Sequence, residues 1–495
     1  MTSRGGWPAL VLLAGAILRF ATLDAQSLWY DEAVTVQLLR IDLSGMLRAI
    51  PDSESTPPLY YVLAWLWTHV FGTGEVGLRS LSALLGTATI AAAWALGRRL
   101  GGARAALGAA ALVAFNPMLI WFSQEARAYA LLALLGALSA LLWLRALEQP
   151  RHAARLLGWG AVAALALATH YYAVFLIAPQ GLWLALRAPG LRERAAALVL
   201  PLATGLALAP LALGQRANEG AAFIGESTLL TRLAQVPKQF LVGYDAPLEP
   251  LLIALTALAV LIGFAGLAAL VGGRDSARDV VSSRARNETT LLTGLTAAAL
   301  ALPVLGALAG EDHLITRNVV AALAPACALV GAGLAVAARR LPRGAPAALA
   351  VACLAGALAA VGVARSPELQ RDDWRAAVAS LGPIEGPRLI VATPDSALTP
   401  LRYYLPGLRR ATPPAFTTAE IDYVALPVRL PGERPLPPRP ARPVAPATGY
   451  ALADRTYGET FTVLRWRIPA PRPEPVAPSP GLDGEPAALL AVTPP

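Results

Sequence analysis

The run LLIALTALAVLIGFAGLAALV at residues 251–271 contains no charged side chain, and AALAVACLAGALAAVGVA at residues 347–364 has the same character. An α-helix needs about 20 mostly apolar residues to cross the hydrocarbon core of a bilayer. The whole chain of 495 residues is 56% hydrophobic and only 15% charged, whereas soluble domains carry about 25% charged residues. These runs therefore predict a polytopic membrane protein.

Apolar runs of similar length recur along most of the chain and predict an all-α membrane domain of about eleven transmembrane helices. A further apolar segment, PPLYYVLAWLWTHVF at residues 57–71, is short and starts with two prolines. Its length and its Trp and Tyr residues are typical of an interfacial helix, so we predict a juxtamembrane helix there. The predicted spans are residues 7–23, 79–97, 103–121, 128–146, 155–170, 172–187, 195–213, 250–271, 289–309, 318–338 and 345–364.

Basic residues are unevenly distributed between the loops that connect these runs. Forty of the 41 are Arg, and sixteen of these lie in alternate loops near residues 98–104, 145–155, 187–194, 274–286 and 339–343. By the positive-inside rule these loops and the N-terminus are cytoplasmic, in a multi-pass protein of the cell membrane. The same distribution accounts for the net charge of +9 without a nucleic-acid partner. The predicted external loops are residues 24–79, 122–127, 214–249 and 310–317.

The composition changes after the last apolar run, which ends the predicted transmembrane domain at residues 1–365. Residues 366–467 contain WRAAVASL, with helical character, and PRLIVAT, IDYVALP and ETFTVLRWR, with strand character. We predict a small α/β domain here, and the parity of the spans makes it extracytoplasmic. The remaining residues, 468–495, are Pro-rich and predict a disordered tail.

The first polar cluster on the predicted external face is SLWYDEA, with Tyr30, Asp31 and Glu32 just beyond the first span. Two adjacent carboxylates at a membrane boundary can serve as a general base and as a metal or hydrogen-bonding ligand. A solvated helix start is an equally good interpretation, because acidic residues favour the first turn of a helix.

Two more clusters follow, one later in the same external loop and one in the next external loop. Glu54, in DSESTPPLYY, precedes the short aromatic segment, where a carboxylate is ordinarily just solvated. FNPMLIWFSQEARAY places an arginine at a helix start, and such a residue can grip a lipid phosphate or simply extend to the interface. The candidate binding residues of this motif are Gln124, Glu125, Arg127 and Tyr129.

His170 and Tyr171, in ATHYYAVF, lie at the external end of two apolar runs. A lone His is either a packing residue or a metal ligand. In GEDHLITRN, Arg317 opens a membrane helix, where its charge is costly unless it is paired or bound to an anion. The spans themselves are almost free of ionisable residues, which argues against ion-coupled transport, and no P-loop, GxSxG or HExxH pattern occurs. Together these external residues predict a site.

The chain resembles the bacterial family 39 type of C-fold glycosyltransferases, which includes protein O-mannosyltransferases and lipid A aminoarabinose transferases. The matching pieces are WYDEA, PPLYY with FGTGEVGLRSLSALLGTATIAAAWALGRRLGG, NPMLIWFSQEARAYAL, THYYAVF and RDDWRAAV. The resemblance implies that a polyprenyl-phosphate lipid donates the sugar to an external acceptor with inversion. It also implies that Asp31 deprotonates the acceptor hydroxyl, with Glu32 assisting.

The resemblance further implies that a divalent metal can bind near the site, with Glu54 and His170 as candidate ligands. Many relatives have His just before the PPLYY element, and this chain has Thr56, so a metal cofactor is left open. Arg127 and Arg317 would stabilise the phosphate that leaves. The acceptor is left open among protein Ser or Thr, a lipid and a cell-wall glycan.

Two other classes of function are compatible with these patterns. A transporter or flippase of lipid-linked sugars needs a similar groove but no general base. A non-catalytic membrane assembly protein would present the external domain and would tolerate the loss of Asp31 and Arg127. The enzyme is the preferred interpretation because acids, a His and two isolated arginines gather on the face that is otherwise poor in basic residues.

Overall fold

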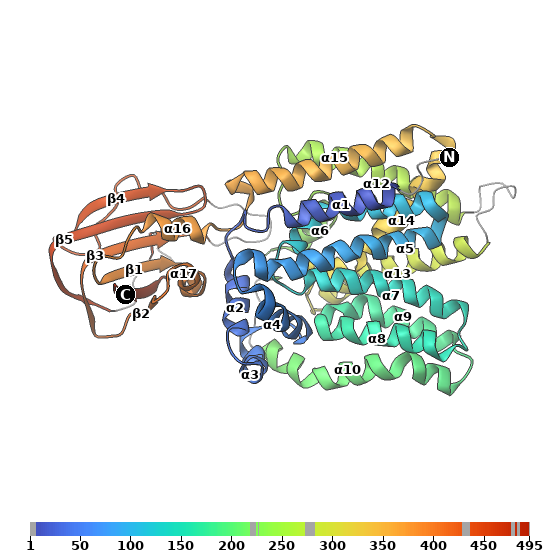
Figure 1. The fold of residues 1–495 in the computed structure, drawn as a ribbon, viewed down its shortest axis with the longest axis horizontal. Helices are drawn as coiled ribbons and strands as arrows, with labels where there is room; N and C mark the ends of the chain where they lie inside the picture. Colours follow the sequence, from blue (N-terminus) through green and yellow to red (C-terminus); the bar gives the residue numbers. More distant parts are fainter. Residues whose placement is uncertain are drawn as a thin grey trace. The chain divides into compact units, whose positions relative to one another are not determined.

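The computed structural model describes residues 6–217, 224–225, 227–272, 283–427, 436–476, 481–482 and 486–494. The chain divides into two compact units. The first comprises Met1–Leu23 and Leu38–Val363, and the second comprises Asp24–Gln37 and Ala364–Pro495. The first unit is helical in every described element (Figure 1).

The helices of the first unit follow the predicted apolar runs. Seven of those described are long and apolar enough to span a membrane, which confirms a multi-pass membrane protein. The bounds are α1 Gly6–Phe20, α3 Leu43–Ser53, α4 Leu59–Phe71, α5 Glu75–Phe115, α6 Pro117–Ser123, α7 Tyr129–Glu148, α8 Ala153–Thr169, η1 Tyr171–Ala173, α9 Val174–Arg187, α10 Leu191–Ala217, α11 Leu229–Val242, α12 Glu249–Val271, α13 Ser283–Leu308, η3 Thr316–Ala322, α14 Leu323–Arg340 and α15 Gly344–Arg365.

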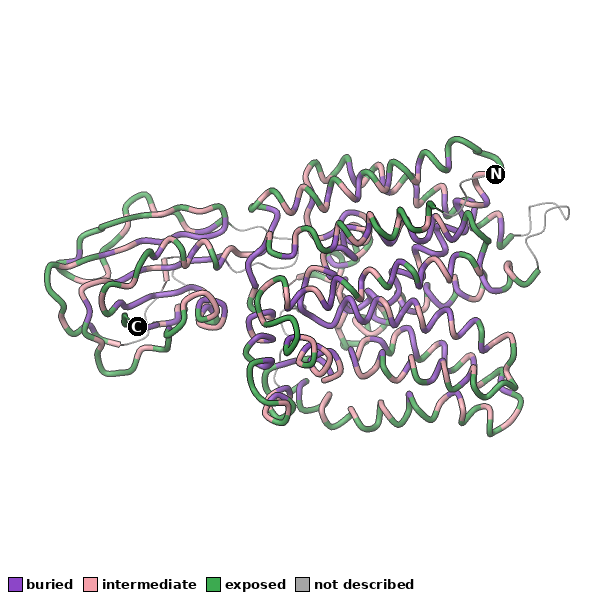
Figure 2. Tube along the Cα trace, in the orientation of Figure 1, coloured by how far each residue is buried: buried purple, intermediate pink, exposed green. Residues whose placement is uncertain are grey.

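The predicted span 79–97 and the first part of the predicted span 103–121 lie within α5, which is interrupted at Gly101 and Gly102. Gly102 has φ of 72° and ψ of −159°, a conformation that glycine adopts without steric cost. The short aromatic segment forms α4, a helix of 13 residues, as its length predicts. Burial separates core helices from peripheral ones (Figure 2). In the most apolar 18 residues of Thr316–Arg340, 89% of the residues are buried, but in those of Leu191–Ala217 only 11% are buried, so we expect α10 to face lipid.

Ion pairs between loops show which loops share an end of this helical unit. Arg99 lies 2.7 Å from Glu148 and 2.6 Å from Glu288. The arginine-rich helix ends near residues 99, 148 and 288 therefore contact one another. At the other ends of the helices, Arg127 pairs with Glu54, and a separate pair joins Arg216 to Glu311 at 2.9 Å. Loops predicted to share a side therefore contact one another. Which side is cytoplasmic stays a prediction, and Arg274 and Arg278 of the fourth basic loop lie outside the described residues.

Small residues bring α12 and α14 into close contact. A Cβ atom added to Gly333 would collide with the carbonyl oxygen of Gly263, and one added to Gly266 would collide with that of Gly333. Membrane helices gain their association energy from this kind of close packing, because lipid offers no hydrophobic driving force between them. The glycines thus set the distance between two helices of the core.

We expect Gly333→Ala to separate these helices and to lower the free energy of unfolding by about 1–3 kcal/mol, the usual cost of overpacking. The measurement is the thermal unfolding midpoint of the detergent-purified protein. Gly294→Ala in α13 is the matched control, because open space surrounds the position where its Cβ would lie. Equal midpoints for the two variants would contradict this packing.

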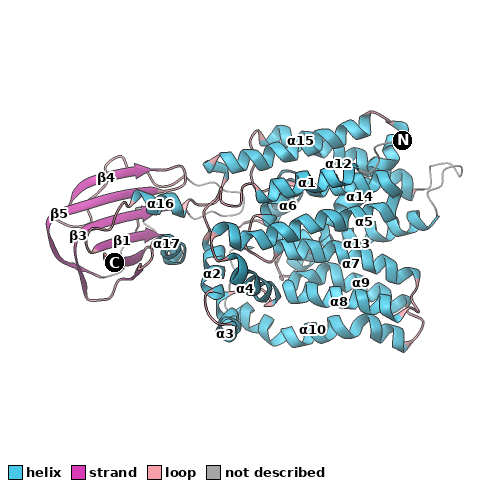
Figure 3. Cartoon of the chain, in the orientation of Figure 1, coloured by secondary structure: helices cyan, strands magenta, loops and turns pink. Residues whose placement is uncertain are grey.

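The second unit is an α/β domain, as predicted (Figure 3). Its sheet has the strand order β2-β6-β1-β3-β5-β4, in which β1 and β3 are parallel and the other neighbours are antiparallel. The helix α2, Tyr30–Leu39, begins in this unit. The other bounds are α16 Trp374–Ser380, β1 Arg388–Thr393, α17 Leu398–Tyr404, β2 Arg409–Arg410, β3 Ala415–Ala425, β4 Ala451–Tyr457, β5 Thr462–Pro475 and β6 Ala488–Val492, with the 3-10 helices η4 Pro367–Leu369 and η5 Asp395–Ala397.

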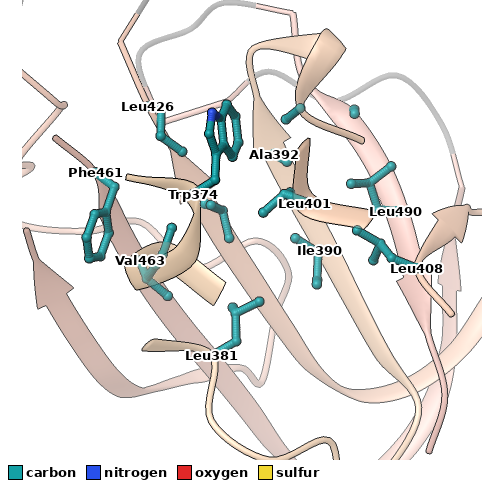
Figure 4. Close-up of a cluster of buried hydrophobic side chains, with 14 of the residues drawn as sticks. Trp374, Leu381, Ile390, Ala392, Leu401, Leu408, Leu426, Phe461, Val463 and Leu490 are labelled. Atoms are coloured by element: carbon teal, nitrogen blue, oxygen red, sulfur yellow. The ribbon is translucent and has the colours of Figure 1, made fainter. Parts of the chain in front are cut away.

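Trp374 at the start of α16 packs into the hydrophobic core of this domain (Figure 4). Its side chain is 3% exposed, and the same cluster includes Ile390 of β1, Leu401 of α17 and Leu490 of β6. The continuous apolar run in PRLIVAT therefore forms a strand that is buried on both faces.

The region predicted to be a disordered tail contributes to the sheet. Residues 468–475 continue β5, and Ala488–Val492 forms β6 between β1 and β2. The apolar residues of AALLAV provide the reason, because Ala488 and Leu490 are fully buried and anchor this segment. Proline content alone predicted disorder, but the short apolar run within it determines the observed structure.

Candidate active site

A buried ion pair joins two of the predicted site residues in the first unit. Nη1 of Arg127 donates to Oε1 of Glu54 at 2.9 Å, and Nη2 lies 2.8 Å from Oε2. The side chains are 8% and 3% exposed. This bidentate geometry is the strongest that a guanidinium and a carboxylate can form, and it fixes both groups in orientation.

The local sequence explains why Arg127 lies at this position. Asn116 caps α6 by accepting a hydrogen bond from the Leu119 amide, and Pro117 occupies the first turn. The helix ends at Gln124, whose side-chain amide donates to the Leu18 carbonyl at 2.9 Å and to the Thr22 hydroxyl at 2.7 Å. Gln124 thus holds the connection between α6 and α7 against the end of α1. Arg127 follows in the short turn before α7. A substrate-binding role for Gln124 stays a prediction.

Tyr61 and Gln215 join this region, although sequence reasoning did not single them out. The Tyr61 hydroxyl lies 3.0 Å from that of Thr56, and the Arg127 guanidinium lies 5.8 Å from the centre of its ring. Gln215 accepts a hydrogen bond from the Tyr171 hydroxyl at 2.7 Å and donates to the Thr56 carbonyl at 3.4 Å. The PPLYY motif contained the signal for Tyr61, but Gln215 lies in an otherwise apolar helix without any motif.

His170 lies in the short connection between α8 and α9, and it is 3% exposed. Its ring centre is 5.8 Å from that of Tyr129, and its Nδ1 accepts a hydrogen bond from the Tyr172 amide at 3.3 Å. Burial lowers the pKa of His170 to about 3, and the nearby charges of Arg317 and Arg127 add to the lowering. His170 is therefore neutral at physiological pH, and two arginines lie in its electrostatic surroundings.

The loop before Arg317 is held by ion pairs and hydrogen bonds. Asp312 pairs with Arg232 of α11 through both carboxylate oxygens. His313 lies 2.9 Å from the Tyr172 hydroxyl, and its carbonyl accepts a hydrogen bond from the Asn318 side chain at 2.8 Å. Arg317 follows in the first turn of η3. The GEDHLITRN motif thus uses its acids and its His to fix the loop that carries Arg317.

The structure brings Glu54, Glu125, Arg127, Tyr129, His170, Tyr171 and Arg317 into the same unit. Contacts or electrostatic effects connect Arg127 with Glu54, and His170 with Tyr129, Arg127 and Arg317. Glu125 is buried at 2% exposure. Several of these residues therefore lie close together in the first unit, and their role as one site stays a prediction.

Asp31, Glu32 and Tyr30 lie in the second unit, in the first turn of α2. The Ala33 amide donates to the Trp29 carbonyl at 3.0 Å, which starts the helix one residue before Tyr30. Asp31 is half-buried, Glu32 is fully buried, and Tyr30 is 43% exposed. Only Asp31 and Tyr30 can therefore meet a solvent-borne substrate without a change of conformation. The convergence of Asp31 with the residues of the first unit stays a prediction.

The candidate metal ligands do not form a metal site with the residues that the structure describes. Both oxygens of Glu54 are occupied by the guanidinium of Arg127. Within the described ranges, no group of three or more His, Cys, Asp or Glu side chains could hold a metal ion. One His and a carboxylate that is already paired supply too few ligands for a divalent cation.

Comparisons with known proteins agree with this architecture. Residues 55–213 match the model of the family described as dolichyl-phosphate-mannose-protein mannosyltransferase. This segment includes Arg127, His170 and Tyr171 but ends before Arg317 and begins after Glu54. A search of curated protein sequences finds no match. The family resemblance predicted from the motifs is confirmed over this segment.

One solved structure shares the fold at low sequence identity, with a TM-score above 0.5. ArnT from Cupriavidus metallidurans in the apo state has a TM-score of 0.51 and 16% identity, and the match covers 82% of this chain and 85% of that chain. The crystal structure of this ArnT bound to undecaprenyl phosphate gives 0.49 and 15%, with 81% and 84% covered. The Archaeoglobus fulgidus oligosaccharyltransferase in complex with Zn and sulfate gives 0.46 and 15%, with 80% and 61% covered. The chain thus has the fold predicted from its sequence.

Proposed function

We propose that this chain, a membrane protein with the C-type glycosyltransferase fold and a mannosyltransferase-family segment, transfers a sugar from a polyprenyl phosphate to an extracytoplasmic acceptor. The family match carries this proposal, because its description names a polyprenyl-phosphate-linked sugar as donor. The buried Glu54–Arg127 pair and the neighbouring His170 support it, since they gather polar groups at one end of an apolar helical unit. A lipid donor accounts for the placement of a sugar transferase in the membrane.

In the proposed reaction, Asp31 accepts the proton of the acceptor hydroxyl as its oxygen attacks the anomeric carbon. The bond between that carbon and the phosphate oxygen breaks, the polyprenyl monophosphate leaves, and the configuration inverts. Glu32, which is fully buried, orients the first turn of α2 and does not contact the acceptor. No step of this mechanism requires a metal ion.

The second element of the proposed mechanism is positive charge beside the phosphate that leaves. Arg127 and Arg317 would stabilise the charge that remains on the phosphate, because preorganised cations act strongly in a site that excludes water. Glu54 holds Arg127 in a fixed orientation, and the loop at residues 310–318 holds Arg317. Tyr129, Tyr171, Gln124 and Glu125 are the other proposed contacts of the donor.

We assign the N-terminus to the cytoplasm and the C-terminal domain to the extracytoplasmic side. The uneven distribution of arginine between alternate loops supports this orientation. It also places Asp31 and Arg127 on the side where nucleotide sugars are absent, so that a lipid-linked sugar is the appropriate donor.

The function is tested by incubating the purified protein with a panel of polyprenyl-phosphate sugars and an acceptor mixture. Consumption of one donor, with release of polyprenyl phosphate, is the expected result, and the Asp31→Asn variant is the control. Transport of a labelled donor across liposomes without any consumption would instead identify a flippase. If the protein neither consumes nor transports a donor, an assembly protein is the remaining class of function.

We expect turnover to be insensitive to chelators, because Arg127 already neutralises the carboxylate that would hold a metal. The measurement compares donor consumption before and after treatment with EDTA, and again after addition of Mg²⁺, Mn²⁺ or Zn²⁺. Loss of turnover with EDTA and recovery with one metal would contradict this expectation. It would also indicate that Glu54 exchanges Arg127 for the ion.

A further inference from the structure

The segment that precedes Asp31 is held by the C-terminal α/β domain through hydrogen bonds. Ser27 Oγ donates to the Asp372 carbonyl at 2.7 Å and accepts from the Trp374 amide at 3.1 Å. The side chain of Gln26 accepts a hydrogen bond from the Arg371 amide at 3.1 Å. These contacts lie within the second unit and bridge about 345 residues of sequence.

Further contacts surround the same segment. The Leu28 amide donates to the Tyr404 hydroxyl at 2.6 Å, and the Arg375 guanidinium donates to the Asp24 carbonyl at 2.8 Å. The guanidinium of Arg371 lies 5.5 Å from the centre of the Trp29 ring, a cation–π distance. Five of the six residues 24–29 are therefore contacted by residues 371–375 or by Tyr404.

The holding residues are themselves fixed in the core of the domain. The Trp374 side chain packs against the buried cluster shown in Figure 4, while its backbone amide binds Ser27. Asp373 caps α16 through the Ala376 amide, and its own amide donates to the Thr460 hydroxyl at 3.0 Å. Motion of residues 371–374 relative to the sheet would break these contacts, so the anchor is rigid.

Asp31 follows this anchored segment without any intervening loop. The Trp29 carbonyl accepts the first hydrogen bond of α2. The Thr35 hydroxyl donates to the Asp31 carbonyl one turn later, at 2.9 Å. Gln26, Ser27 and Leu28 are 6%, 3% and 0% exposed, so water cannot replace their partners easily. The position of the carboxylate therefore depends on the hydrogen bonds of residues 26–28.

We propose that the C-terminal α/β domain is a positioning module for the general base, with Ser27 and Tyr404 as its positioning residues. This inference rests on the proposed function, in which Asp31 is the base. It assigns to the domain a role in the catalytic step, beyond covering the external face or binding the acceptor. Misplacement of a catalytic group by about 1 Å can lower a rate by roughly 100-fold, so a loosened anchor should reduce kcat.

The test uses the full-length protein and the double variant Ser27→Ala/Tyr404→Phe, which removes three hydrogen bonds to residues 27 and 28. The matched control is Ser380→Ala/Tyr457→Phe in the same domain. The Ser380 hydroxyl, which the variant removes, donates along α16 to the Ala376 carbonyl, and the Tyr457 hydroxyl donates to the Pro440 carbonyl. Two readouts are compared: kinetics with the consumed donor, and amide hydrogen exchange of residues 24–37.

We expect kcat of the double variant to fall roughly 10- to 100-fold, while KM for the donor changes less than about threefold. Exchange in residues 24–37 should become at least several-fold faster, and the control should match the wild type in both readouts. Unchanged kcat would overturn the proposal, whether or not exchange accelerates. A parallel loss in the control would also overturn it, because a general defect of the domain would then be the cause.

Failure of the proposed function gives a different pattern. If the wild-type protein consumes no donor, both the proposed function and the catalytic part of this inference are wrong. Exchange in residues 24–37 then still decides whether the C-terminal domain holds this segment. Fast exchange in the wild-type protein would overturn the structural part as well.

Discussion

Asp31→Asn should reduce turnover by about 10²–10⁴-fold, the usual contribution of a general base, while donor binding persists. Asn has nearly the same shape as Asp but cannot accept a proton from the acceptor hydroxyl at neutral pH. The first turn of α2 should remain intact, because the Thr35 bond goes to the Asp31 carbonyl and not to its side chain. The measurement is the rate of polyprenyl phosphate release, together with a binding assay for the labelled donor.

Asp52→Asn is the matched control, because Asp52 is an exposed acid in α3 and has no assigned role. It should retain wild-type turnover. Loss of donor binding in Asp31→Asn would indicate that Asp31 contacts the ground-state donor. Retention of turnover would remove Asp31 as the base.

Arg127→Met should destabilise the protein by about 3–5 kcal/mol, because it leaves the Glu54 carboxylate buried without its partner. Glu54→Gln should be destabilising in the same direction, since it breaks the same bidentate pair. Removing both charges in Glu54→Gln/Arg127→Met should restore much of the thermal midpoint, as replacing both members of a buried pair is often close to neutral. Arg48→Met, at an exposed position in α3, is the control.

The double variant separates a structural role of Arg127 from a role in binding the phosphate. We expect its thermal midpoint to recover while turnover stays low, because the phosphate has lost one of its two cations. Recovery of both properties would show that Arg127 acts only through stability. Loss of stability in the double variant as large as in Arg127→Met would contradict the ion-pair argument.

The membrane architecture was predictable from the sequence because each span has its own local signal. Charge-free runs marked the helices, and arginines such as Arg99 and Arg155 marked the loops that share an end. The parity of the loops followed from these two observations together. Helix ends were less accurate, as in α5, where Glu75 and not residue 79 begins the helix.

Pairings between distant residues were not predictable from one sequence. Glu54 and Arg127 were each identified as candidates, but 73 residues separate them and no local pattern indicates that they bind each other. Gln215 was missed for the same reason, since a polar residue in an apolar helix has many possible partners. The strand at residues 488–492 was missed because proline around it outweighed a short apolar run in the prediction.

The shared unit of residues 24–37 and the C-terminal domain has a consequence for biosynthesis. Ser27 is translated 345 residues before Asp372, its hydrogen-bond partner. At about 5–20 residues per second, the ribosome needs roughly 17–70 s to cover this distance. During that interval the nascent chain can insert its helices in the membrane, but the segment before Asp31 lacks its partners. The proposed site is therefore complete only after the C-terminal domain has been synthesised. We expect a product that terminates before residue 371 to insert in the membrane but to consume no donor.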